Sequence, residues 1–422
     1  QGHISALARL PQEGLVLSGR SIYTAAVRGG VTPVGDIALG LRKVWDGGAG
    51  NDNWNVAANW NDDRVPAADD DVYIPVTATV SIYGYYNTIH SLRSDGRLTL
   101  ASGDLTLLGD AIVRSNLTLV SGRLASSAGI TVTGLFSWTN GTLAGPGRVV
   151  ALGGLALQGT DRFLEGAALV NRGAGAWESG NQHLTEGAVL ENAAGATLTI
   201  SANATLAHYY NAGAAPRFEN RGVLTKTGTS TLQLLTAFDN AGRVAVEAGE
   251  LLLNGALNHT GAFAVASGAT LRLNNSATGV MATGSTVTGA GTVILNTSTG
   301  SGRSLTLAGA YALSGETQQL SGATVISPTA TFSTGRLWLS NGRLEPQTAI
   351  TVTNVMTWSS ATLAGPGSTY VAQRIVLDGG NRLLDGHTLH NGGQATWLGT
   401  IRGANGAVWH NLPGATLDIP GD

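Results

Sequence analysis

The chain contains no cysteine among its 422 residues, which excludes disulfide bonds and thiolate metal sites. Only two lysines are present, Lys43 and Lys226, and the formal net charge is -3. Without a basic stripe the chain has little to attract a phosphate backbone, so nucleic acid is not an expected partner. No run of about eighteen apolar residues occurs, so no segment is predicted to span a membrane.

Charged residues are also scarce, at 12% of the chain against roughly a quarter in an average soluble protein. The 60 glycines are about twice the average share. The surface must therefore be covered by Thr, Ser, Asn and Gly, which suit turns and the outward faces of stacked strands better than long helices. The lack of cysteine favours an exported protein, and from a start at Gln1 without Met we expect a processed or trimmed amino terminus.

A short motif recurs along the chain: an apolar residue, any residue, then Asn, with Gly two or three places later. Three pairs of adjacent copies are 21, 20 and 20 residues apart, and alternating runs such as Thr270–Leu273 lie between copies, bounded by Gly or Asn. Such runs indicate strands with one inward face. Strands that return every ~20 residues with no helical pattern between them predict an all-β fold, a right-handed parallel β-helix (β-solenoid) with two or three strands per turn.

The Asn of this motif has two interpretations. Asparagines at the same place in successive turns can occupy a left-handed turn and stack their amides as a ladder. They can equally be turn residues exposed to water. Either way the role is structural, and no catalytic residue is predicted. The asparagines concerned are Asn171, Asn192, Asn220, Asn240, Asn391 and Asn411.

A longer repeat has an offset of 220 residues and relates residues 142–147 to residues 362–367. It defines a duplicated block at about 115–200 and 335–420 inside a solenoid predicted for residues 81–422. About 340 residues at ~20 per turn give roughly sixteen turns. Duplication lengthens a stack in which each turn contacts only its neighbours, whereas duplicating an active site within one chain is rarer.

Two arginines, Arg162 and Arg382, are matched by the duplication, and each is followed closely by an acid, Glu165 or Asp385. We interpret each pair as a structural ion pair at a turn.

A compositionally different stretch, residues 43–80, precedes the solenoid. It contains Val44-Trp45-Asp46-Gly47-Gly48, Asn51-Asp52-Asn53-Trp54, Ala58-Asn59-Trp60, Val65-Pro66 and Asp69-Asp70-Asp71-Val72-Tyr73-Ile74-Pro75. This pattern resembles the module that opens many giant bacterial β-helical surface proteins, namely autotransporter passengers and filamentous-haemagglutinin-type adhesins. Residues 138–147 and 218–228 are similar to phrases in such passengers. The resemblance covers residues 43–422 and implies export, a stalk or filament, and contact with other cells or surfaces. It implies no catalytic residues.

The acids of this module allow two interpretations. Their oxygens are ligands of the type that Ca²⁺ prefers, although neither a regular Asp-x-Asp-x-Asp-Gly loop nor a nonapeptide repeat is present. The preferred interpretation is a cap, in which carboxylates accept backbone N–H groups and tryptophans cover the first turn; no other cofactor is expected. The candidate Ca²⁺ ligands are Asp46, Asp52, Asp69, Asp70 and Asp71. Residues 1–42 are predicted to be an arm that pairs with another subunit, or a strand region packed on the cap.

The main functional hypothesis is a structural and adhesive extracellular protein, secreted or held at the cell surface. The chain stops at Ile419-Pro420-Gly421-Asp422, straight after a strand, so further chain or a second copy is expected there. Because exposed strand edges template pairing, head-to-tail stacking of copies would give a filament.

Two alternatives belong to other classes. One is a solenoid that binds glycans of a host or neighbouring cell through tryptophans, which stack on sugars if exposed and plug the turns if buried. The tryptophans concerned are Trp138, Trp177, Trp338, Trp358 and Trp397. The other is a polysaccharide lyase or hydrolase, which needs paired carboxylates or a base beside a cation. Acids are thinly scattered along the solenoid, so we expect no enzyme.

Overall fold

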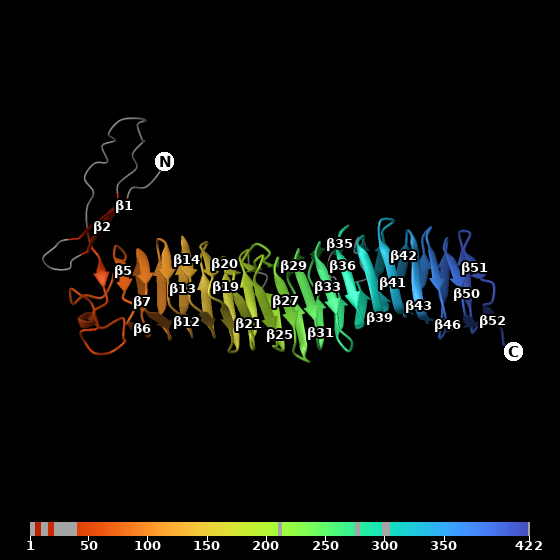
Figure 1. Cartoon of the computed structure of the whole chain (residues 1–422), viewed down its shortest axis with the longest axis horizontal. Coiled ribbons are helices and arrows are strands. Elements are labelled where there is room, and N and C mark those ends of the chain that lie inside the picture. The colour runs from red at the N-terminus through yellow and green to blue at the C-terminus, as the bar shows by residue number, and fades with distance from the viewer. Residues whose placement is uncertain are drawn as a thin grey trace, which may run out of the picture. The chain divides into compact units, whose positions relative to one another are not determined.

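A computed structural model of the chain describes residues 5–9, 16–20, 40–209, 213–274, 279–297 and 304–420. These residues confirm the predicted all-β parallel β-solenoid, which has almost no helix and makes about 17 turns. Among them, no helix is long and apolar enough to cross a membrane. The chain divides into two compact units, Gln1–Gly153 and Gly154–Asp422, and Figure 1 shows stacked strands in each.

Unit 1 has three strands per turn, and each strand pairs in parallel with its counterparts in the neighbouring turns. The first stack contains β4 (Lys43–Val44), β5 (Asp71–Ile74), β8 (Ser91–Ser94), β11 (Ala111–Val113), β14 (Gly129–Val132) and β17 (Arg148–Ala151). The second contains β6 (Thr79–Ile82), β9 (Arg97–Leu100), β12 (Leu117–Leu119) and β15 (Phe136–Trp138). The third contains β7 (Tyr86–Ile89), β10 (Asp104–Leu107), β13 (Arg123–Ser126) and β16 (Gly141–Ala144).

Unit 2 is built in the same way around three faces. Its first face contains β20 (Ala168–Asn171), β23 (Val189–Asn192), β26 (Arg217–Asn220), β29 (Ala237–Asn240), β32 (Leu257–His259), β35 (Gly279–Met281), β38 (Leu305–Leu307), β40 (Ala323–Ile326), β42 (Arg343–Pro346), β44 (Thr362–Ala364), β47 (Arg382–Asp385) and β50 (Ile401–Ala404).

The second face of unit 2 starts with β18 (Leu155–Leu157), β21 (Ala174–Trp177), β24 (Thr197–Ile200), β27 (Val223–Lys226), β30 (Arg243–Val246), β33 (Ala262–Val265) and β36 (Thr286–Gly289), and ends with β45 (Ser368–Val371), β48 (Thr388–Asn391) and β51 (Val408–Asn411). The third starts with β19 (Asp161–Glu165), β22 (Asn181–Thr185), β25 (Ala204–His208), β28 (Thr231–Leu234), β31 (Glu250–Leu253), β34 (Thr270–Leu273) and β37 (Thr292–Asn296), and ends with β46 (Arg374–Leu377), β49 (Gln394–Thr396) and β52 (Thr416–Asp418).

Three long strands of unit 2 run through the bend between its second and third faces. They are β39 (Ala310–Ser321), β41 (Thr331–Leu339) and β43 (Ala349–Trp358). The first half of β39 pairs with β36 and its second half with β37, so this one strand belongs to both the second and the third face. In this part of the unit the bend is therefore made without a separate turn, and the site described below lies along it.

The alternation seen in the sequence fills the interior of the solenoid. In β28, Leu232 and Leu234 are buried, and they pair in register with Leu251 and Leu253 of β31, which are also buried. Burying one such side chain contributes about 2 kcal/mol, and the residues between them, Gln233 and Leu252, point outward. The core is a continuous column of aliphatic side chains along each unit.

The duplicated sequence lies on different faces within unit 2. Arg162 is on β19 of the third face, whereas its match Arg382 is on β47 of the first. Likewise β20, which ends at Asn171, belongs to the first face and its match β48, which ends at Asn391, to the second. The same segment therefore folds equally well on more than one face.

The amino-terminal module contains a buried cluster of three tryptophans. The ring of Trp60 meets Trp45 and Trp54 edge to face, with centroids 5.2 and 4.8 Å apart, and its Nε1 donates to the carbonyl oxygen of Trp54 at 2.8 Å. A short 3-10 helix, η1 (Ala57–Asn59), leads into Trp60. Lys43 is buried here and its ammonium group binds Asp62.

Part of the predicted amino-terminal arm, residues 1–42, is described. There, β1 (Ser5–Arg9), β2 (Val16–Arg20) and β3 (Gly40–Leu41) form an antiparallel sheet. Residues 1–4, 10–15 and 21–39 lie outside the described residues.

Candidate functional site

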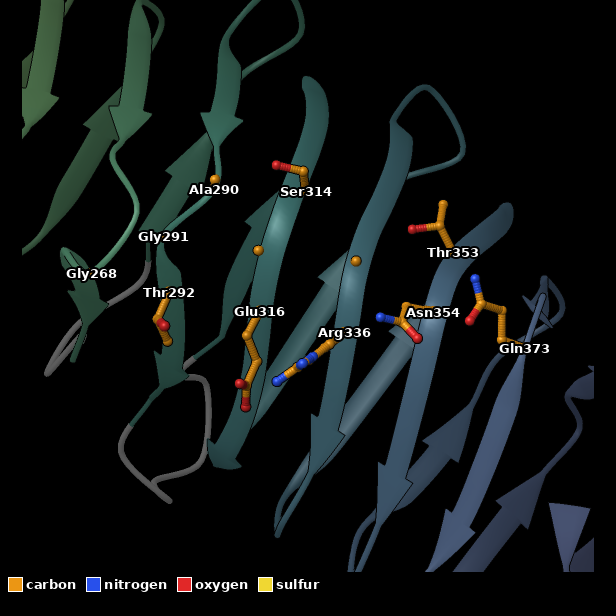
Figure 2. Close-up of a pocket in the computed structure, with 12 residues that line it drawn as sticks. Gly268, Ala290, Gly291, Thr292, Ser314, Glu316, Arg336, Thr353, Asn354 and Gln373 are labelled. Carbon is orange, nitrogen blue, oxygen red and sulfur yellow. The ribbon is translucent and has the colours of Figure 1, made fainter. Parts of the chain in front are cut away.

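A polar groove of about 640 Å³ lies along the bend between the second and third faces of unit 2. Figure 2 shows Ser314 and Glu316 on one strand, Arg336 on the next, and Thr353 and Asn354 on the one after. Its lining runs across successive turns, so the groove is elongated in the stacking direction. The lining residues are Gly268, Ala290, Gly291, Thr292, Ser314, Gly315, Glu316, Gly335, Arg336, Thr353, Asn354 and Gln373.

The concave floor follows from how the long strands bend. The register of β39 against β41 shifts between Leu313 and Glu316, and that of β41 against β43 shifts between Thr334 and Arg336. Each shift is a β-bulge, which kinks the strand and redirects the side chains that follow. Backbones approach closely at the kink: a Cβ on Gly335 would lie 2.1 Å from the carbonyl oxygen of Ser314. Only glycine fits there, so tight stacking leaves the floor without side chains.

The groove carries one negative and one positive side chain. Glu316 and Arg336 are register neighbours on β39 and β41, and Figure 2 shows Arg336 extending toward the strand of Glu316. Glu316 accepts a hydrogen bond from Gln318 Nε2 at 2.9 Å. The guanidinium of Arg336 is exposed and, among the described residues, has neither an ion pair nor a hydrogen bond. It is therefore available to an external anion.

A smaller cavity of about 200 Å³ adjoins the groove and shares Glu316 and Arg336 with it. Trp338 lines this cavity, half-buried, with Val355 and Thr357 on the next strand. Its indole Nε1 donates to Ser359 Oγ at 3.3 Å, which holds the ring in place. An aromatic ring thus stands beside the free guanidinium.

The five tryptophans of the predicted glycan platform do not come together. Trp138, Trp177 and Trp358 are fully buried, and each indole Nε1 donates to a backbone carbonyl, of Asn140, Gly180 and Ala361 respectively. These three rings fill the interior of the solenoid and cannot contact a ligand. Trp397 is half-buried, its ring 5.3 Å from that of Trp409, so Trp338 alone lies at the groove.

Four of the six motif asparagines form one buried ladder on the first face of unit 2. Asn171 Nδ2 donates to Asn192 Oδ1 at 2.9 Å, Asn192 to Asn220 at 2.8 Å, and Asn220 to Asn240 at 2.7 Å. The second amide hydrogen of Asn171 reaches the carbonyl oxygen of Thr197, so both of its donors are used. These asparagines end strands and none has a positive φ, so the left-handed conformation considered above does not occur.

The ladder ends on a buried histidine. Asn240 Nδ2 donates to His259 Nδ1 at 2.9 Å, and His259 Nε2 donates to the carbonyl oxygen of Thr286 at 3.4 Å. This arrangement needs a neutral ring, and burial lowers the pKa of His259 to about 4. The other two asparagines form a shorter ladder on the second face, where Asn391 Nδ2 donates to Asn411 Oδ1 at 2.6 Å.

Neither matched arginine forms the ion pair predicted from the sequence, Arg162 with Glu165 or Arg382 with Asp385. Arg162 is fully buried, and its guanidinium donates to the carbonyl oxygens of Gln158, Ser179 and Gly180. Desolvation by burial lowers its pKa to about 10. Arg382, also buried, likewise donates to four backbone carbonyls, whereas Asp385 pairs instead with Arg343 at 3.2 Å. The arginines thus hold the ends of successive turns together.

Four of the five candidate Ca²⁺ ligands contact protein donors. Asp46 accepts the N–H of Gly48, Asp52 accepts Ser81 Oγ at 2.8 Å, and Asp70 accepts the N–H of Ala67. Asp71 contacts His90 Nδ1 at 2.8 Å, and Asp69 is exposed. In the part of the chain that the structure describes, no group of three or more His, Cys, Asp or Glu residues is placed to hold a metal ion.

Sequence reasoning missed Glu316 and Arg336, because a lone acid and a lone arginine on outward strand positions match no motif. The available signal was the stretch 331–339, where inward positions at Phe332 and Thr334 shift by one residue at Gly335 to Leu337 and Leu339, without a turn sequence between them. Such a run indicates one long strand through a bend.

No protein-family model, no curated protein and no solved structure matches this chain.

Proposed function

We propose that this solenoid is part of an extracellular structural protein, a stalk or self-assembling filament at a bacterial surface, and that it serves adhesion rather than catalysis. The resemblance of residues 43–80 to the opening module of bacterial surface adhesins supports this proposal, as does the lack of cysteine.

One observation carries the proposal: the large buried polar side chains bind the backbone or the side chains of neighbouring turns. The asparagine ladder from Asn171 to Asn240 and the carbonyl contacts of Arg162 are examples. In enzymes such costly buried groups converge on a cavity, where their shifted pKa values serve the reaction. Here they strengthen the stacking of turns, which is what a structural scaffold requires.

The groove supports binding better than bond cleavage. Hydrolysis of a glycosidic bond normally uses two carboxylates on either side of it. Among the residues that line the groove, Glu316 is the only acid. We therefore expect no hydrolase activity from this site.

Negative-stain microscopy of the purified chain at several concentrations tests the structural part. We expect elongated particles, and fibres at high concentration if copies stack end to end. A version with a globular protein fused at the carboxy terminus is the control, because it should give single particles only. Beads coated with the chain should attach to cells or glycan surfaces better than uncoated beads. Globular particles, or cleavage of polysaccharides by the chain, would overturn the proposal.

A further inference from the structure

We propose that the groove along β37 to β46 binds a linear glycan that carries carboxylates, with Arg336 as the anion contact and Trp338 as the stacking surface. This inference names a ligand class for the adhesive role proposed above and rests on that role.

The charge of the ligand follows from the arginines. Glu316, Arg336, Val355 and Arg374 follow one another in the same register row. The two cations stand about 10 Å apart at ~4.8 Å per strand and outnumber the one carboxylate, that of Glu316, which lies at the end of the row away from Arg374. Both are exposed, and in the described part of the chain neither has a side-chain partner. A planar guanidinium recognises a carboxylate through two parallel hydrogen bonds.

The sugar character follows from the rest of the lining. Trp338 is on β41 two residues after Arg336, so both side chains point outward from the same strand, and its half-buried ring offers a flat surface to C–H groups. Thr292, Asn354 and Gln373 add neutral donors and acceptors suited to hydroxyl groups. Aromatic, guanidinium and amide groups together match a hydroxylated ring that carries a carboxylate.

The shape favours a chain of sugars over a single sugar or a peptide. From β37 to β46 the groove crosses four strand spacings, about 19 Å at ~4.8 Å each. An extended peptide binds best by adding to a free sheet edge, and the groove floor offers none because its strands are paired on both sides. A linear glycan needs no such edge.

Oligogalacturonate is the test probe, since it is linear and carries a carboxylate on every sugar; its fully methyl-esterified form is the neutral counterpart. Isothermal titration of the whole chain should show the acid form binding at least tenfold more tightly than the ester, with an affinity that falls as salt is raised. Equal binding of the two forms would overturn the assignment of an acidic ligand, and no binding of either would overturn the site.

Single substitutions test whether the glycan binds at this groove. Arg336→Gln should weaken binding of the acid form about tenfold and remove the preference over the ester, because a charge-assisted pair of hydrogen bonds is lost. Arg336→Lys should retain part of the preference, and Trp338→Ala should weaken both forms alike. Arg97→Gln is the matched control, an exposed arginine on β9 of unit 1. If Arg336→Gln and Arg97→Gln bind alike, the groove is not the site.

These outcomes separate the two proposals. Loss of glycan binding with elongated particles intact would leave the structural role standing, whereas globular particles that still bind the glycan would do the reverse.

Discussion

At the scale of single residues, the chain buries polar side chains at low cost because successive turns supply identical partners. Asn192 both accepts from Asn171 and donates to Asn220, so each amide is satisfied by the next copy of itself. A buried amide without partners would cost a few kcal/mol. A buried asparagine, which would be costly alone, therefore links one turn to the next through side-chain hydrogen bonds.

Asn192→Ala removes one rung and leaves Asn171 and Asn220 with unpaired buried groups. We expect the free energy of unfolding to fall by about 2–4 kcal/mol, the cost of two unsatisfied groups. The matched control is Asn258→Ala, an exposed position next to His259, where the change should stay within about 0.5 kcal/mol. Urea unfolding followed by circular dichroism measures both, and equal effects would contradict the ladder.

Two buried histidines make stability depend on pH. Burial lowers the pKa of His259 and of His387 from the usual 6.5 to about 4. His387 Nε2 accepts from Thr369 Oγ1 at 2.9 Å while Nδ1 donates to the carbonyl oxygen of Gly365, so this ring is also neutral.

Between pH 4 and 6.5 the unfolded chain binds more protons than the folded chain, so the stabilisation is complete above 6.5 and is lost as the pH falls toward 4. Each histidine is expected to cost about 3 kcal/mol over this range. Unfolding titrations at pH 7 and 4.5 should show a smaller loss for His259→Gln than for the unchanged chain. An identical loss would mean that His259 is not buried as a neutral ring.

At the scale of elements, the bend between the second and third faces of unit 2 decides where the groove forms. The long strands β39, β41 and β43 pass through it, and their bulges open the concave side. Elsewhere in the unit the same bend separates two short strands, such as β30 and β31.

Gly335→Ala tests this bend, because a Cβ there would press on the carbonyl oxygen of Ser314. We expect a loss of about 2 kcal/mol, as for other overpacked positions, and a lower thermal midpoint. Gly403→Ala on β50 is the control: its Cβ would meet only Ala407, at 4.0 Å, and the midpoint should hardly change. A tolerated Gly335→Ala would show that the strands do not approach so closely.

At the scale of the whole molecule, stability is distributed turn by turn, because each turn contacts only its neighbours. The tryptophan cluster around Trp60 covers the first turns of unit 1, and the aliphatic column continues from there. Damage at one place should therefore open nearby turns and leave distant ones folded.

Trp54→Ala should remove about 3–5 kcal/mol of packing from the cluster. Hydrogen exchange is expected to speed up in β5, β6 and β7, while β14, β15 and β16 of the same unit keep their protection. Trp338→Ala, outside the cluster, serves as the control and should leave β5 to β7 unchanged. Uniform loss of protection throughout unit 1 would show global rather than local cooperativity.

The sequence by itself determined the strands, the period near 20 residues, the duplicated block and the tryptophan-rich module. These follow from local alternation and from glycine and asparagine at the bends, and such signals repeat in every turn. The tryptophan-rich module stood out by its different composition, whereas the contacts of Trp60 with Trp45 and Trp54 came from the structure.

Only the tertiary structure decided which face each copy occupies, that Trp138 is buried while Trp338 borders a groove, and that Arg162 binds carbonyls. The physical reason is that every face of a solenoid accepts the same alternating strand, so the sequence of one turn does not specify its neighbours. Burial and partners depend on residues one turn away in the stack, some twenty positions along the chain, and they exist only once the turns are stacked.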